Sequence, residues 1–470
     1  MSLHLSLLLF YAVALVGLGL WLGRRVRRAG DFFVAGRTLG PGLLFSTMLA
    51  ANIGAGSTVG AASLGYRTGL SAWWWVGSAG LGSIALAFWI GPRIRAIAAR
   101  HDLRTVGDFL ELRYGRSVRA LIALLLWFGS LAILAAQLIA LAWVLNVSVG
   151  LSKTAGCLIG GVVMTAYFAA GGIATTARVN LVQLTVLIAG FALAVPLALD
   201  TAGGWRAVAT TGEAGYWSFW SGTDSGWALM PMLVPAFIVS PGLLQKVYSA
   251  EDDRAVRFGV GWNAGALLLF AFVPPLLGAI ARTAHPALPN PDLALPTLLM
   301  ESVPPIIGSL GLAAVFSAEI SSADAILFML ATSLSQDLYR RFVAPAADDA
   351  TVLRVARVAA VVGGALGVML AVAVESVVDA MAIFYTLLSV SLFVPIMAGL
   401  YLRRAATPEI LAAIVTGVSA VLVTQFTASD GMFEWLTPAM TGLLLSVAAA
   451  GTVGAVRPQI QRWIQGRSDA

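Results

Sequence analysis

Apolar runs of about 20 residues recur along the whole chain, and each is long enough to cross the hydrocarbon core of a bilayer. With 59% hydrophobic and only 11% charged residues, the composition lies far outside the range of a soluble domain. We therefore predict an all-α polytopic membrane protein with about thirteen transmembrane helices. The thirteen runs are centred near residues 13, 52, 82, 132, 162, 189, 239, 269, 320, 364, 389, 417 and 444.

The first apolar run, from Leu3 to Leu22, has the length of a signal peptide but lacks its other features. No basic segment precedes it, four arginines follow it within residues 24–28, and no small-residue cleavage pattern stands before them. We interpret it as a retained membrane span.

The basic residues predict the orientation of the spans. With the N-terminus outside and the C-terminus cytoplasmic, 25 of the 29 basic residues fall in cytoplasmic segments, as the positive-inside rule requires. The net charge of +6 is thus a topology signal, and because the arginines alternate with spans it indicates no nucleic-acid partner. We predict a multi-pass protein of the inner or plasma membrane, in contact with the lipid bilayer.

The residues of the usual membrane-enzyme chemistries are missing. The single cysteine, Cys157, excludes an internal disulfide, and the three histidines are isolated. No HExxH, GxSxG or glycine-rich phosphate loop is present. The polar stretches are loop-sized, which leaves no room for an output domain. We predict a protein that is not an enzyme, with no organic cofactor and no obligate protein partner.

Spans two and seven contain residues that interrupt a helix. In span two, Asn52 is followed by Gly54 and Gly56, and glycines in mid-membrane weaken a helix and let carbonyls turn away from it. In span seven, Pro241 removes one backbone donor and the glycine after it gives the chain freedom to unwind. For span two taken alone, the alternative is that its small residues serve only close helix packing. For span seven taken alone, the alternative is a structural kink at Pro241 and Gly242.

The two interrupted spans are five spans apart. If spans two to six and seven to eleven are inverted repeats, each broken helix is the first of its repeat. Interrupted helices at matching positions of two repeats are the best sequence pointer to a transporter's binding site. We predict a single integral membrane domain over residues 1–470, with a 5+5 core made of repeats at 40–200 and 229–402. An extra helix at 3–22 precedes this core, and two more at 406–456 follow it.

Span nine carries two carboxylates far from both its ends, Glu319 and Asp324. An ionisable group in mid-membrane costs several kcal/mol unless it is paired, hydrated or bound to an ion. At about 100° per residue, Ala318, Ser321 and Ser322 share a face that the two acids flank. Oxygens on this face form half a shell for a hard monovalent cation, and the unwound backbone of span two can supply the rest. Alternatively, the serine hydroxyls bond only to carbonyls one turn earlier.

These features together resemble the solute:sodium symporter family, which has the leucine-transporter-type inverted-repeat fold. The resemblance covers about residues 30–400 and rests on short motifs in a specific order and spacing. The motifs are Asp31 to Arg37 after the first span, Ala50 to Ile53 at the break, Gly171 to Gln183, Gln245 to Ala250, and Ser321 to Tyr339.

The resemblance implies where the sodium ion and the solute bind. The implied sodium ligands are the carbonyls of Ala50, Ile53 and Ala318 and the hydroxyls of Ser321 and Ser322. The solute is implied to lie between the unwound parts of spans two and seven. The residues implied there are Asn52, Gly54, Ser57, Gln137, Ser240 and Pro241.

One position departs from the family's pattern. The family usually has an aspartate where this chain has Asn180, while Glu319 and Asp324 add charge on the neighbouring span. We treat all three as ion-coupling candidates, with Asp324 as the hypothetical replacement for the missing carboxylate. Ser57 stands where a sugar-transporting relative has a longer amide. No basic residue is expected in mid-span, although the N–H groups of a broken helix can still bind a carboxylate.

We predict a secondary active transporter that couples sodium entry to uptake of a small organic solute, an amino acid or a monocarboxylate, by alternating access. Na+ is then the transported ion. The alternatives are a proton-coupled symporter that uses Glu319 or Asp324 and a substrate of the sugar or vitamin type. A channel would need a ring of like residues, and none is obvious in this sequence. A membrane receptor would need an output domain, which the sequence also does not show.

Overall fold

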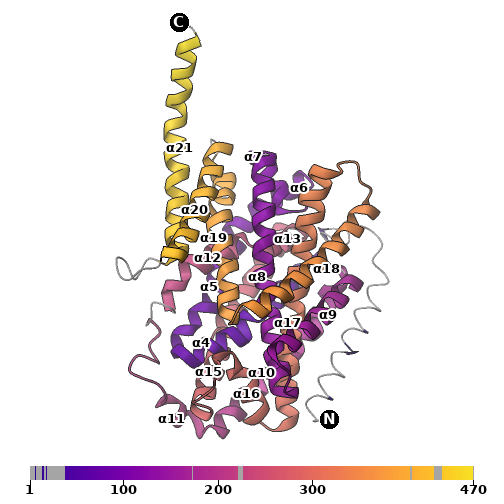
Figure 1. The fold of residues 1–470 in the computed structure, drawn as a ribbon, viewed down its shortest axis with the longest axis vertical. Helices are drawn as coiled ribbons and strands as arrows, with labels where there is room; N and C mark the ends of the chain where they lie inside the picture. The colour runs from indigo at the N-terminus through magenta and orange to yellow at the C-terminus, as the bar shows by residue number, and fades with distance from the viewer. Residues whose placement is uncertain are drawn as a thin grey trace.

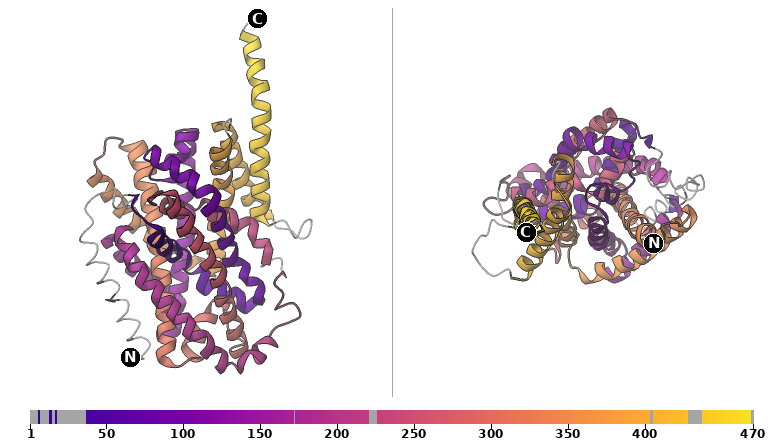
Figure 2. Two further views of the ribbon diagram at one scale, coloured as in Figure 1. Left: turned by 180° about the vertical axis from the view of Figure 1, so that it is seen from behind. Right: turned by 90° about the horizontal axis from the view of Figure 1, so that it is seen from above.

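The computed structural model describes residues 37–468 except 172, 221–225, 403–404 and 428–436, together with residues 6, 13, 14 and 17. Within these residues the regular secondary structure is helical, and one isolated bridge joins Leu39 to Ala250. Figure 1 shows the helices packed side by side, with α21 (Pro438–Ser468) standing out beyond the bundle. Figure 2 shows the same arrangement from behind and from above. The prediction of an all-α protein is confirmed.

Ten helical stretches among the described residues are long and apolar enough to cross a membrane, in agreement with ten of the predicted spans. Of the other three, the first lies outside the described residues except for four isolated positions, and the second is split by a break. The fifth corresponds to α9 (Lys153–Gly171), in which Lys153–Thr165 is a shorter apolar helix. A multi-pass protein is confirmed, while the total of thirteen and the repeat boundaries remain predictions.

The first broken helix is the one predicted at Asn52. Helix α3 (Pro41–Asn52) ends where Ile53 takes an extended conformation, with φ −99° and ψ 103°. A π-helical turn (Gly56–Gly60) and α4 (Ala61–Thr68) then continue toward the other end of the bundle. Because a helix that ends leaves its last carbonyls without intrahelical partners, this break exposes backbone oxygens inside the protein.

The second broken helix is the one predicted at Pro241. Helix α12 (Met230–Val239) ends at Ser240, which has φ −53° and ψ 121°. Helix α13 (Pro241–Tyr248) begins with the proline at its first position, where the missing N–H costs no helical hydrogen bond. Pro241 therefore starts a half-helix inside the bundle, and does not merely kink a continuous one.

Helix α17 (Pro305–Thr332) is the element that both the sodium prediction and the acids depend on. It packs against α3, α8 (Arg116–Val149) and α10 (Ile173–Thr201), so its middle is enclosed by protein. A π-helical segment (Ser333–Val343) extends it to the end of the bundle at which α7 (Val106–Tyr114) lies. We call this end the α7 end.

The remaining helices complete the bundle. They are α5 (Trp73–Ala85), α6 (Gly91–Arg100), α11 (Gly204–Ala209), α14 (Asp253–Phe270), α15 (Val273–Ala284), α16 (Ala294–Glu301), α18 (Asp349–Ala373), α19 (Val377–Tyr401) and α20 (Thr407–Thr427).

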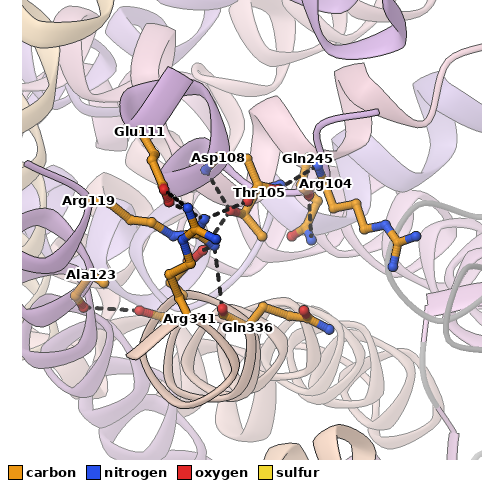
Figure 3. Close-up of polar contacts among 11 residues, drawn as sticks. Arg104, Thr105, Asp108, Glu111, Arg119, Ala123, Gln245, Gln336 and Arg341 are labelled. Carbon is orange, nitrogen blue, oxygen red and sulfur yellow. Dashed lines mark hydrogen bonds and ion pairs between the residues drawn. The ribbon is translucent and has the colours of Figure 1, made fainter. Parts of the chain in front are cut away.

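A cluster of charged side chains surrounds Arg119 at the α7 end, as Figure 3 shows. The guanidinium of Arg119 lies 2.9 Å from Asp108, 2.8 Å from Glu111 and 2.6 Å from Asp337, and its side chain is only 7% exposed. Arg341 pairs with Glu111 from the other side. This Arg119 cluster joins α7, α8 and the π-helical end of α17 into one unit.

Two further features hold α7 in this unit. Thr105 caps the N-terminus of α7 in a capping box with Asp108, and its hydroxyl also donates to Asp337 at 2.7 Å. Burial alone would raise the pKa of Glu111, but hydrogen bonds from Arg341 and Arg119, and their charges, lower this pKa below its ordinary value. The lowered pKa means that folding favours the ionised, paired form of Glu111.

We expect Arg119→Met to lower the free energy of unfolding by about 3–5 kcal/mol, because it leaves three carboxylates without their shared cation. Thermal unfolding of the purified protein in detergent measures this loss. A carboxyl group whose pKa is lowered on folding contributes stability at pH values above its pKa in the unfolded chain. The stability difference between the wild-type protein and Arg119→Met should therefore shrink as the pH falls toward about 4.

Arg116→Met is the matched control, because Arg116 precedes Arg119 on the same helix but is 67% exposed and lies 3.8 Å from Glu111. It should cost less than about 1 kcal/mol. Equal losses in the two variants would contradict a structural role for the Arg119 cluster.

Candidate functional site

Two hydroxyl groups of α17 face the carbonyls that the break in α3 exposes. Ser321 Oγ donates to the carbonyl of Ala50 at 3.2 Å, and Ser322 Oγ donates to the carbonyl of Ile53 at 3.1 Å. Ala318 lies one turn earlier on α17 and is also buried. The structure thus brings together residues that are about 270 positions apart in the chain, and places α17 against the unwound backbone.

Two polar side chains hold the break in this position. The amide oxygen of Gln137 on α8 accepts a hydrogen bond from the N–H of Ala55 at 2.9 Å. The hydroxyl of Ser57 accepts from the N–H of Gly54 at 2.9 Å and lies 3.1 Å from the carbonyl of Asn52. Gln137 and Ser57 therefore satisfy backbone groups that a continuous helix would satisfy internally.

Gly54 is the point of closest approach between the break and α17. A Cβ atom on Gly54 would lie 2.2 Å from Ser322 Oγ and 2.8 Å from Gln137 Oε1, both far inside van der Waals contact. The absence of a side chain lets the backbone touch the serine. The sequence analysis placed Gly54 at the solute site. In the structure, a glycine is required here because any side chain would collide with Ser322 and Gln137.

A cavity of about 60 Å³, the central cavity, lies between the two broken helices. Five of the six residues predicted at the solute site line it, and the sixth, Pro241, does not. Pro241 lines a second cavity of about 30 Å³ on the α7 side, and Met329 lines both cavities. The five lining residues are Asn52, Gly54, Ser57, Gln137 and Ser240.

The central cavity has two kinds of wall. Its polar groups include Lys246 on α13, at the end of the cavity beyond the second break. Its apolar wall consists of aromatic and methionine side chains, which sequence reasoning did not single out. They are Trp75, Phe237, Met329, Met381, Phe384 and Tyr385. Phe237 and Tyr385 pack with their ring centroids 5.2 Å apart.

Lys246 is a cavity residue that the sequence did not place at the site. No basic residue was expected in mid-span, and Lys246 lies two residues before the end of α13, yet it lines the central cavity. The reason is that α13 starts inside the bundle, so Lys246 stands only five residues from the break. At about 1.5 Å per residue this places its backbone about 8 Å from Pro241. The Gln245-Lys246 pair, one of the motifs that carry the family resemblance, was the feature of the sequence that pointed to this lysine.

Glu319 is fully buried, with 0% of its surface exposed. One carboxylate oxygen, Oε1, lies 3.0 Å from the hydroxyl of Thr58 in the π-helical turn after the break. The other oxygen, Oε2, has no hydrogen-bond partner among the described residues. The side chains of the other two ion-coupling candidates, Asn180 and Asp324, lie outside the part of the chain whose side chains the structure describes.

The described residues contain no group of three or more histidine, cysteine or acidic side chains that could hold a metal ion. The oxygens gathered at the break are neutral carbonyls and hydroxyls, with a single carboxylate beside them. Hard oxygen ligands with little charge suit an alkali-metal cation better than a transition metal.

Comparison with known proteins shows the family of this chain. The sequence model of the sodium:solute symporter family matches residues 32–417, which is most of the chain. This chain belongs to the sodium:solute symporter family. It is therefore a membrane transporter and not an enzyme, and sodium is the ion that its family couples to solute movement.

Several named relatives align with nearly the whole chain. The sodium/pantothenate symporter of Escherichia coli is 26% identical over 466 residues and covers 94% of each chain. The osmoregulated proline transporter of Bacillus subtilis is 23% identical and covers 95% of this chain and 93% of its own. The human high affinity choline transporter 1 is 24% identical, over 88% of this chain and 75% of its own length. The family transports chemically different solutes.

Solved structures confirm the fold. A Na+-coupled sialic acid symporter in a substrate-bound, outward-open state superposes with a TM-score of 0.81 at 20% identity, over 97% of this chain and 98% of that one. A nucleobase-cation-symport-1 family transporter in a closed conformation superposes with a TM-score of 0.57 at 18% identity, over 92% and 96%. The predicted leucine-transporter-type fold is confirmed.

We expect Gly54→Ala to lower the melting temperature of the purified protein. The new methyl group meets Ser322 and Gln137, so the break has to shift, at a cost of about 1–3 kcal/mol. Gly42→Ala is the control on α3, the helix that leads into the break, because a Cβ there meets nothing within 4 Å. That variant should be neutral or slightly stabilised, by up to about 1 kcal/mol. Similar effects at both positions would argue against close packing at the break.

Proposed function

We propose that a sodium ion binds where the end of α3 meets α17, with the carbonyls of Ala50, Ile53 and Ala318 and the hydroxyls of Ser321 and Ser322 as ligands. The observation that carries this is the pair of hydroxyl–carbonyl contacts at 3.2 and 3.1 Å across the break. A hydroxyl that rotates its hydrogen away keeps lone pairs for a cation. The same motion frees each carbonyl, so all these oxygens become available together.

The same contacts support a mechanism of coupling. Sodium at this position would fasten the end of α3 to α17, and the backbone just beyond it, at Gly54 and Ser57, is a wall of the central cavity. Ion binding and solute binding then stabilise one arrangement of the broken helix. By thermodynamic linkage, the affinity for the solute rises with sodium and the affinity for sodium rises with the solute.

We expect the double variant Ser321→Ala, Ser322→Ala to raise the sodium concentration that half-saturates uptake by tenfold or more, a loss of about 1.4 kcal/mol or more. Uptake into proteoliposomes at varied sodium measures this. Ser309→Ala, which removes a hydroxyl that bonds only to Pro305 on the same helix, is the control and should change nothing. An unchanged sodium dependence in the double variant would contradict the assigned site.

We infer that the solute is a small carboxylate with an apolar body, an amino acid or a monocarboxylate. Lys246 is a basic residue in the lining of the central cavity, and the lining residues that the structure describes include no acid. The aromatic and methionine wall suits an apolar portion of the solute. A quaternary ammonium solute would meet the lysine unfavourably, and a sugar would need more hydrogen-bonding side chains than this wall offers. The relatives named for pantothenate and proline fit this class.

A thermal-shift screen with pantothenate, proline, lactate, choline and glucose, each with and without sodium, tests the solute class. We expect one of the carboxylates to raise the melting temperature in sodium but not in potassium, and Lys246→Met to abolish that shift. A shift by choline or glucose alone would contradict the proposal. Uptake that persists when choline chloride replaces sodium chloride would favour the proton-coupled alternative with Glu319 or Asp324 as carrier.

The proposed topology is an outside N-terminus and a cytoplasmic C-terminus, in the inner or plasma membrane. Support comes from the α7 end, where Arg95, Arg104, Arg119, Arg340 and Arg341 gather in the structure, as the positive-inside rule favours for a cytoplasmic face.

A further inference from the structure

The carboxylate of Glu319 is a buried charge without a basic partner. Its surface is 0% exposed, and no lysine, arginine or histidine pairs with it in the described part of the chain. A charge enclosed in a membrane protein is costly unless something positive or a set of donors compensates it. The five oxygens proposed as ligands of the first sodium ion do not include those of Glu319.

The carboxylate of Glu319 has few hydrogen-bond donors around it. The hydroxyl of Thr58 lies 3.0 Å from Glu319 Oε1 and 2.9 Å from the carbonyl oxygen of Gly54. That carbonyl already accepts from the N–H groups of Ser57 and Thr58, each at 3.0 Å, so the single hydrogen of the hydroxyl is available to Oε1. Oε2 of Glu319 has no hydrogen-bond partner among the described residues, and the nearby N–H of Ala55 donates to Gln137. One oxygen of a fully buried carboxylate therefore lacks a hydrogen bond.

We propose that a second sodium ion binds at this cluster, with the carboxylate of Glu319, the hydroxyl of Thr58 and the carbonyl of Gly54 as ligands. A cation contacts all of these oxygens and needs no hydrogen from them. A proton on Oε1 would donate to Thr58 but leave Oε2 without a partner, so it accounts for only part of the geometry. An alkali-metal ion matches the all-oxygen ligand set.

This inference rests on the proposed function, because it places a second ion next to the first. Gly54 joins the two sites: its backbone touches Ser322, which belongs to the first, and its carbonyl faces Thr58, which belongs to the second. Gly54 also lines the central cavity, which offers a route for the ion. Both ions would then stabilise the same break, and the transporter would use two sodium ions for each solute.

Equilibrium binding of radioactive 22Na+ to the purified protein, without solute, tests the proposal. We expect two sodium ions per wild-type chain and one in Glu319→Gln, which keeps the side-chain shape but removes the charge. The double variant Ser321→Ala, Ser322→Ala should also bind one, at the Glu319 site. Glu301→Gln is the matched control, since Glu301 is 58% exposed at the end of α16, and it should still bind two.

The outcomes separate the two proposals. If the wild-type chain binds one ion and Glu319→Gln binds one with unchanged affinity, the second site is wrong while the first stands. If the serine variant still binds two ions, the first site is wrong. Should Glu319→Gln fail to fold, Thr58→Val, which is close in shape, replaces it and should weaken one of two sodium sites about tenfold. Unchanged affinities in Thr58→Val would overturn the proposal.

Discussion

The end of α3 inside the protein is the constraint on which the rest of the site depends. A helix that stops in a dry interior leaves carbonyl oxygens that must find partners, because water is not there to supply them. Here Ser321 and Ser322 supply hydrogens to two of those oxygens. At the proposed sodium site, the same hydroxyls would turn their hydrogens away and leave these oxygens for the ion.

The break and the α7 end of α17 are held by different kinds of interaction. The Arg119 cluster fixes the α7 end of α17 to α7 and α8 through three close ion pairs. The break itself is held by single hydrogen bonds, such as that of Gln137 to Ala55. A single hydrogen bond contributes only about 1 kcal/mol, so sodium at the proposed site would add to contacts that are each weak.

The sequence predicted the features that depend on local pattern. The breaks at Asn52 and Pro241 follow from residues that disrupt a helix wherever they stand, and the serine face of α17 follows from helical periodicity. Contacts between distant segments could not be predicted in this way. Thr58 and Glu319 are 261 residues apart. Periodicity gives the face on which each lies but not the helix it meets, and the Arg119 cluster and the aromatic wall were missed for the same reason.

Met329 lines both the central cavity and the smaller cavity beside Asp337, and it also lies 3.1 Å from where a Cβ on Gly242 would be. On the α17 side, the unbranched side chain of Met329 thus lies between the two cavities. Such a side chain has several rotatable bonds and reorients within nanoseconds when it is not tightly packed. Reorientation of this one side chain is therefore the smallest movement that would connect the two chambers on that side.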